Sequence, residues 1–262
     1  MHNAEGLKIV VDPVRPTGRT LLAAGVEQSY VDVSEPRHLH FEYIRRMAAV
    51  VDLAAPPGRP LAALHLGGGA LTLPRWLAAT RPTSPQRVVE RDPAVVELVA
   101  GELPALPADV EVIIGDAREA VRGASSGHYD VVLADVYRAA RMPRHVATVE
   151  FVAEVARVLA PDGVYLVNVT DLPPLVISRT QVATLRAVFG DVCLVADRRM
   201  LRGRRYGNLV LAATHRAGRL PVGRLAARAA RDPIPGAVLH GPDLDAFVAG
   251  ARPATDADLA GR

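Results

Sequence analysis

The sequence predicts a doubly wound α/β fold with a seven-stranded, mostly parallel sheet, helices on both faces and a short N-terminal β region. Two observations support this prediction. Short apolar runs alternate with helix-like stretches between residues 61 and 215, with brief connections between them. Most of these runs are continuously apolar, as expected for strands that are buried on both faces of a parallel sheet. Such an arrangement is called Rossmann-like.

The elements follow one another in a regular order. Three short β-like runs come first, at 7–11, 20–24 and 28–33, and apolar residues at helical spacing follow from Leu39 to Val50. The strands of the main sheet are expected at 61–66, 87–90, 110–114, 129–134, 163–169, 191–196 and 208–213, and the clearest helices at 72–80, 93–101, 145–159 and 176–189. We therefore divide the chain into an N-terminal β-like and helical segment (1–60), a Rossmann-like domain (61–216) and a C-terminal helix and tail (217–262).

The composition excludes several classes of protein. The chain has 262 residues, one cysteine, 4% aromatic residues and a formal net charge of +3. A groove that stacks nucleic-acid bases on aromatic rings is therefore not expected. No apolar run reaches the roughly 18 residues of a membrane helix, and the N-terminus does not resemble a secretory signal. We expect a cytoplasmic protein without a disulfide framework and without a metal site.

A glycine-rich turn is the most informative motif. The run LHLGGGALTLPRWLA places Gly67, Gly68 and Gly69 between the first strand of the main sheet and a helix. In such sheets this turn borders the ligand crevice, and glycine lets the backbone approach a ligand closely. A tight connection without a ligand is the alternative interpretation. The pattern lacks the G-x-G-x-x-G spacing and the Lys-Ser/Thr pair of phosphate-binding loops.

Carboxylates follow the next two strands. Glu90 ends the second strand and Asp116 follows the third, so both are expected at the same edge of the sheet as the glycine turn. A carboxylate at the second position can accept hydrogen bonds from both ribose hydroxyls, and one at the third can accept from an adenine amino group. A helix N-cap is the alternative role, and for Asp92, which precedes Pro93, we prefer it. The sequence thus predicts a site for a nucleoside with a thioether or sulfonium arm.

The order of several motifs resembles the spermidine synthase family, which has the class I S-adenosylmethionine-dependent methyltransferase fold. The resemblance covers about residues 25–215 and rests on GVEQS (25–29), HFEYIRRM (40–47), LGGG (66–69), VVERDP (88–93), GDARE (115–119), YDVVLAD (129–135) and LAPDGVYLVN (159–168). It implies that S-adenosylmethionine or its decarboxylated form binds here. By resemblance, Gln28 and Glu90 would hold the ribose and methylthio side, Asp116 and Ala117 would border adenine, and Asp135 would deprotonate or orient the attacking amine.

Two positions depart from the family pattern. Ala70 stands where the family has an aspartate that holds the donor's amine, and Arg138 stands where a second aspartate grips the polyamine. Arg138, beside Tyr137 at the expected acceptor site, would repel a dicationic acceptor. We therefore expect methyl transfer to a non-polyamine small molecule. The alternatives are a polyamine aminopropyltransferase and a nucleoside-binding protein without catalysis.

The remaining expectations concern packing and assembly. His65 lies on a strand with apolar neighbours, and we expect a buried, hydrogen-bonded role for it rather than a catalytic one. The N-terminal β-like runs are too short to bury both faces within one chain. We therefore expect them to pair with the same region of a second copy, as a homodimer.

Overall fold

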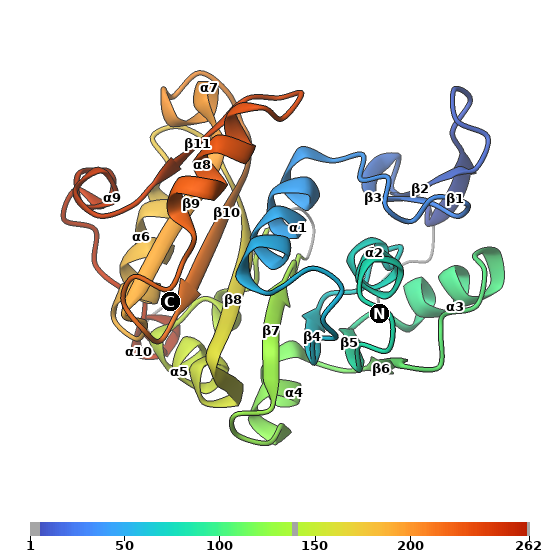
Figure 1. The fold of residues 1–262 in the computed structure, drawn as a ribbon, viewed down its shortest axis with the longest axis horizontal. Coiled ribbons are helices and arrows are strands. Elements are labelled where there is room, and N and C mark those ends of the chain that lie inside the picture. The colour runs from blue at the N-terminus through green and yellow to red at the C-terminus, as the bar shows by residue number, and fades with distance from the viewer. Residues whose placement is uncertain (1–5, 138–140, 261–262) are drawn as a thin grey trace.

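The computed structural model describes residues 6–137 and 141–260 and contains two sheets (Figure 1). Within these residues the main sheet has eight strands in the order β11-β9-β10-β8-β7-β4-β5-β6, and a small sheet has the order β1-β2-β3. The strands of the small sheet are β1 (Lys8–Val11), β2 (Gly18–Ala23) and β3 (Val26–Asp32). The strands of the main sheet are β4 (Ala63–Leu66), β5 (Gln86–Glu90), β6 (Val110–Ile114), β7 (Tyr129–Ala134), β8 (Leu159–Asp171), β9 (Asp191–Asp197), β10 (Gly207–Thr214) and β11 (Gly236–Leu239).

The main sheet confirms the α/β prediction, with one strand more than expected. Strands β4 to β8 pair in parallel, and β10 is antiparallel to both β8 and β9. The additional strand is β11, which pairs antiparallel with β9 at the edge of the sheet. It has four residues and is only partly buried, so it lacks the long apolar run that marked the other strands.

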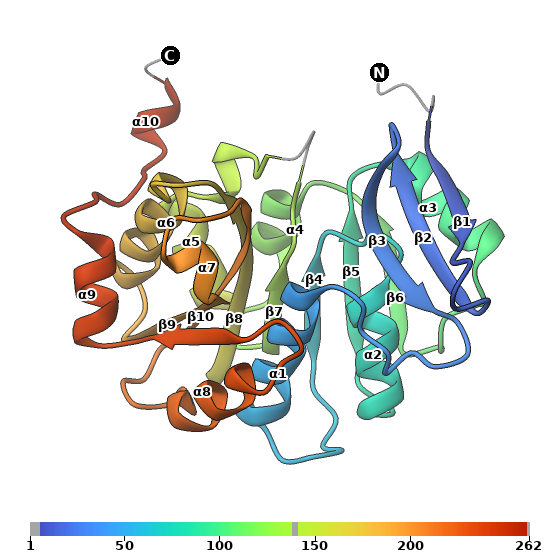
Figure 2. The same ribbon diagram turned by 90° about the horizontal axis from the view of Figure 1, so that it is seen from above.

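Helices cover both faces of the main sheet, as Figure 2 shows. One face packs against α1 (Glu42–Ala54), α2 (Thr72–Thr80) and α8 (Val222–Ala230). The other face packs against α4 (Ala117–Gly123), α5 (Val149–Val158) and α6 (Val176–Arg186). The remaining helices are α3 (Pro93–Glu102), η1 (Arg144–Val146), α7 (Arg198–Leu201), α9 (Pro242–Val248) and α10 (Ala257–Ala260). In the described residues, no helix has the length and apolar character needed to cross a membrane.

The strand order creates the crevice where a ligand is expected. From β4 the chain first continues outward to β5 and β6 and then returns to β7 on the other side of β4. The connecting helices α2 and α4 consequently lie on opposite faces of the sheet. Open α/β sheets bind ligands at the carboxyl ends of strands at such a reversal. The ends of β4, β5 and β7 therefore define the place to look for a site.

The small sheet packs beside this crevice. Its inner side chains Leu21 and Val31 form an apolar cluster with Leu71 and Val99 of the main domain. Hydrogen bonds add to the contact, because the Thr72 hydroxyl donates to the Tyr30 carbonyl at 2.7 Å and lies 3.0 Å from the Ser29 hydroxyl. The glycine turn that precedes Thr72 is thereby covered by β3.

Two local predictions are confirmed by the structure. The Asp92 carboxylate accepts a hydrogen bond from the Ala94 amide and caps α3, with Pro93 at the first helical position. His65 is buried and its Nε2 lies 2.8 Å from Oε1 of Gln86. Burial lowers the pKa of His65 to about 4, so the ring is neutral at physiological pH and serves the core.

The outer surface of the N-terminal region leads to a prediction about assembly. Val11, Val14 and Val26 are 56%, 90% and 60% exposed, although each could be buried against a second apolar surface. We expect a two-fold dimer through β1–β3, with a mass in light scattering of twice 27.9 kDa. Val11→Glu should shift that mass toward the monomer, because it places a charge in the contact. A wild-type monomer at micromolar concentration would contradict the dimer.

Candidate active site

The glycine turn is shaped by a close approach between two strands. Gly67 has a φ of +91°, and a Cβ at this position would collide with the Asp135 carbonyl at the end of β7. The Gly67 amide donates to the Val89 carbonyl at 2.9 Å, and the Asp135 amide donates to the Leu66 carbonyl at 2.8 Å. These bonds join the tips of β4, β5 and β7. Glycine is required at position 67 because a side chain would push β7 away.

Glu90 is fixed against this turn by backbone amides. Its Oε2 accepts from the amides of Gly68 at 2.8 Å and Gly69 at 3.3 Å. Its Oε1 accepts from the amides of Arg91 at 2.8 Å and Asp92 at 3.0 Å. The carboxylate is half-buried and its position is determined before any ligand arrives. An acceptor that is held in this way suits recognition of paired hydroxyls.

Asp116 has the capping role that we considered as its alternative. Its Oδ1 accepts from the Arg118 amide at 2.9 Å and the Glu119 amide at 3.4 Å, which caps α4. Its Oδ2 lies 3.1 Å from His145 Nε2 and 3.9 Å from Arg91 Nη1. Burial alone would raise the pKa of Asp116, but the hydrogen bonds from His145 and the α4 amides lower it below the usual value. The cap leaves Oδ2 available for other contacts, because the helix amides bind Oδ1 and only the His145 side chain lies within hydrogen-bond distance of Oδ2 in the described residues. The next residue, Ala117, is buried at the start of α4.

Asp135 lies at the tip of β7 between two hydrogen-bond donors. Its Oδ1 accepts from Asn168 Nδ2 at 2.9 Å, and its Oδ2 accepts from the Tyr43 hydroxyl at 3.1 Å. Burial raises the pKa of Asp135, the two donors act in the opposite direction, and the nearby Glu90 charge adds to the increase. A carboxylate with a raised pKa is a stronger base than an exposed one. The arrangement can therefore accept a proton from an amine that enters the crevice.

Tyr137 supports the end of β7 rather than presenting a free hydroxyl. The hydroxyl donates to the Asn168 carbonyl at 3.0 Å and accepts from the Thr170 amide at 2.6 Å. Tyr137 thus links the Asp135 strand to β8, where Asn168 lies. Arg138, the other residue that we assigned to the acceptor, lies outside the described residues. Arg141, which follows it in the same segment, is exposed.

Gln28 does not contact the carboxylates of the crevice in the structure. It is exposed on β3, and its Nε2 donates to the Val26 carbonyl at 3.2 Å. Its neighbour Ser29 is the residue that reaches the glycine turn, where a Cβ on Gly69 would lie 3.2 Å from the Ser29 side chain.

Two residues that position Asp135 were not expected from the sequence. Tyr43 fits the apolar spacing of α1, and Asn168 interrupts an otherwise apolar strand, so neither stood out as a site residue. The available signal was Asn168, which is a polar residue in a fully buried stretch and needs a partner. Among the described residues, no group of three or more His, Cys, Asp or Glu side chains is arranged to hold a metal ion.

Comparison with known proteins identifies the family. Residues 40–195, more than half of the chain, match the spermine/spermidine synthase domain. The chain belongs to the spermine/spermidine synthase family. A polyamine aminopropyltransferase of Vibrio vulnificus is 32% identical over 165 residues, which are 62% of this chain and 53% of that protein. The chain thus matches only about half of the length of this curated relative.

Solved structures agree with the family and the fold. The crystal structure of a probable spermidine synthase from Corynebacterium glutamicum has a TM-score of 0.88 and 28% identity, covering 98% of this chain and 95% of that one. Human methyltransferase-like protein 13 in complex with SAH has a TM-score of 0.61 and 21% identity, covering 84% of this chain and 100% of that one. The second likeness concerns the fold alone.

These findings correct the function that we expected from the sequence. Methyl transfer to a non-polyamine acceptor is wrong as the main interpretation, because the family match and the relatives are those of aminopropyltransferases. Ala70 was one of the two departures behind that expectation. Its side chain is 1% exposed and packs with Leu21, Val31 and Leu71, so the position borders the core under the small sheet. Ala70 is therefore part of the apolar contact with the small sheet.

The contact between Gly67 and Asp135 gives a prediction about stability. Gly67→Ala should lower the free energy of unfolding of the protein by several kcal/mol, because the alanine would have a positive φ and its Cβ would collide with the Asp135 backbone. Urea denaturation measures the change. Gly115→Ala is the matched control at the tip of β6, where a Cβ would make an ordinary contact of 3.8 Å with Val89. Equal stability of both variants would show that the close approach does not shape the turn.

Proposed function

We propose that the protein is a polyamine aminopropyltransferase that uses decarboxylated S-adenosylmethionine as the donor. The observation that carries the proposal is the Asp135 carboxylate, held by Tyr43 and Asn168 at the tip of β7 next to the glycine turn and Glu90. A chain of the spermine/spermidine synthase family with this carboxylate in place has the base that amine alkylation needs.

The charges in the crevice favour a strongly cationic donor. Glu90 and Asp135 are close enough for the Glu90 charge to raise the pKa of Asp135, and Asp116 adds a third carboxylate at the next strand tip. S-adenosylmethionine carries a carboxylate of its own, whereas the decarboxylated form has only the sulfonium and an ammonium group. The ribose hydroxyls would bind Glu90, and adenine would lie near Asp116 and Ala117. The sulfonium would then face Asp135 across the glycine turn.

The chemical step follows from this placement. The neutral amine nitrogen of the acceptor forms a bond to the methylene carbon of the donor's aminopropyl group that is attached to the sulfonium. The carbon–sulfur bond breaks, both of its electrons go to sulfur, and methylthioadenosine leaves. The nitrogen loses a proton, and Asp135 accepts it. Tyr43 and Asn168 are positioning residues, because they bind the carboxylate and not the reacting atoms.

The acceptor is proposed to be a small aliphatic polyamine. Its second ammonium group is expected to bind near the carboxylates of the crevice or near polar groups on β8, such as Thr170, whose hydroxyl lies 2.8 Å from Asn208 Oδ1. Exposed Tyr206 and Leu172 offer apolar surface for the methylene chain on the same side. The acceptor's length is the part of the proposal that an assay of several amines would determine.

Replacing the proposed base tests the function directly. Steady-state assays with decarboxylated S-adenosylmethionine and putrescine should show aminopropyl transfer by the wild type. Asp135→Asn should lower kcat by about 10²–10⁴-fold, the usual contribution of a general base. Methylthioadenosine binding should be retained in that variant, which separates a lost base from a lost fold. Methylated product from S-adenosylmethionine, without aminopropyl transfer to any amine, would contradict the proposal.

The hydrogen bond from Tyr43 leads to a prediction about pH dependence. Asp135 accepts a proton only when it is ionised, so activity falls as the pH decreases through its raised pKa. The Tyr43 hydroxyl stabilises the ionised form, and Tyr43→Phe should therefore move the acidic limb of the kcat profile to higher pH. Tyr137→Phe is the control, because its hydroxyl bonds to the backbone of β8. A shift of the limb to lower pH in Tyr43→Phe would contradict this role.

A further inference from the structure

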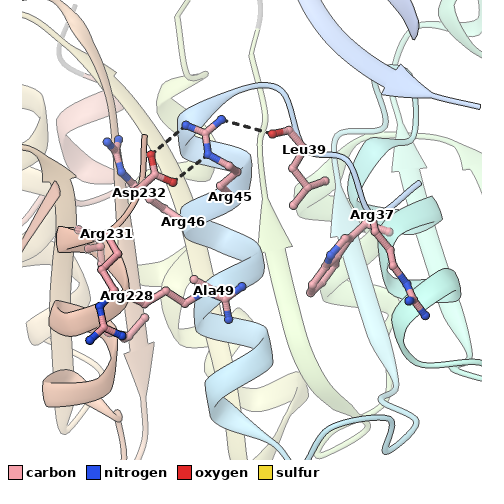
Figure 3. Close-up of a pocket in the computed structure, with 12 residues that line it drawn as sticks. Arg37, Leu39, Arg45, Arg46, Ala49, Arg228, Arg231 and Asp232 are labelled. Carbon is pink, nitrogen blue, oxygen red and sulfur yellow. Dashed lines mark hydrogen bonds and ion pairs between the residues drawn. The ribbon is translucent and has the colours of Figure 1, made fainter. Parts of the chain in front are cut away.

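A cavity of about 320 Å³ opens between α1, α2 and α8, away from the glycine turn (Figure 3). Five arginines line it, together with one carboxylate in the described part of the chain; the charged residues are Arg37, Arg45, Arg46, Arg228, Arg231 and Asp232. Figure 3 shows Arg228, Arg231 and Asp232 on one side of α1 and Arg37 on the other. We call this cavity the arginine pocket.

Two of the five arginines are already neutralised. Arg45 makes a two-point contact with Asp232, with Nε and Nη2 at 2.8 and 2.9 Å from the carboxylate oxygens. Arg228 forms an ion pair with Asp52, with Nη1 3.0 Å from Oδ2. Across residues 6–137 and 141–260, no carboxylate lies within 4.0 Å of the guanidinium of Arg37, Arg46 or Arg231. The arginine pocket therefore carries an excess of positive charge.

Arg46 is a buried arginine of the pocket whose hydrogen-bond donors are not all used. It is only 3% exposed, and within the described residues its Nε and Nη1 have no hydrogen-bond partner. Its remaining contact is a long one of 3.4 Å from Nη2 to the Ile234 carbonyl. Burial lowers the pKa of Arg46, although the charges of Glu42, Asp232 and Asp197 act in the opposite direction. A buried guanidinium with unused donors is costly, and an anion that accepts from them removes the cost.

We propose that the arginine pocket binds a small organic anion through a phosphate or carboxylate group. A guanidinium presents parallel donors that match both of these groups. The cavity volume lies at the lower end of the roughly 300–1,000 Å³ of small-molecule sites, so it exceeds what an inorganic ion alone would fill. Trp76, Leu225 and Val195 also line the cavity and offer apolar surface to the carbon part of such a ligand.

The site is separate from the proposed aminopropyl transfer. None of the lining residues belongs to the glycine turn or to the carboxylates at the tips of β5, β6 and β7. The two sites share only α1, where Tyr43 contacts Asp135 one helical turn before Arg46. Binding can therefore be measured without an activity assay, and its outcome does not depend on which amine the enzyme uses.

Anion binding is tested by calorimetry and thermal unfolding with inorganic phosphate and with citrate, at an ionic strength matched by sodium chloride. We expect one of these anions to raise the melting temperature of the wild type above the chloride control. Phosphate alone would identify a phosphate ligand, and citrate alone a carboxylate ligand. Arg46→Met should raise the measured Kd of the anion at least tenfold. Arg224→Gln, an exposed arginine on α8 that does not line the cavity, is the matched control and should bind as the wild type does.

Three results would overturn the proposal: no shift with either anion, an equal shift with chloride, or wild-type affinity in Arg46→Met. Should Arg46→Met fail to fold, Arg231→Gln decides the question, because Arg231 is exposed at the end of α8 and its loss does not disturb the core. Weakened binding in Arg231→Gln supports the site, and unchanged binding rejects it.

Discussion

The backbone contact between Gly67 and Asp135 is the constraint on which the crevice depends. The glycine at the tip of β4 touches the carbonyl at the tip of β7, and the amides around both residues bind β4 to its neighbours. This contact places the Asp135 carboxylate beside the turn that holds Glu90. The small sheet then covers the turn through Thr72.

The polar groups of the crevice are arranged before a ligand binds. Glu90 is held by four backbone amides, and Asp135 by one phenol and one amide side chain. Fixed acceptors of this kind do not have to reorganise when charge moves in a reaction. Burial raises the pKa of Asp135, the nearby Glu90 charge adds to the increase, and the carboxylate is a better base as a result. In the proposed function, this one arrangement both binds a cation and accepts a proton.

Much of the fold was predictable, because buried parallel strands leave long apolar runs. The edge strand β11 was not, since four partly exposed residues carry no such pattern. For the site, the glycine turn and the carboxylates at the strand ends could be found by position. Tyr43 could not, because its partner Asp135 is 92 residues away. Asn168 stood out only as a polar residue in a buried strand, and its partner, 33 residues away, is visible only in the structure. Ala70 was interpreted as facing the ligand, whereas its side chain is buried. Burial at a single position can be seen only in the packed structure.

We propose that Glu90 and Asp135 face the same nucleoside. The most direct test is a crystal structure of the protein with methylthioadenosine. We expect the ribose hydroxyls to bind Glu90, adenine to lie beside Asp116 and the methylthio group to face Asp135. A nucleoside bound elsewhere, or one whose sulfur points away from Asp135, would show that the two carboxylates do not share a ligand.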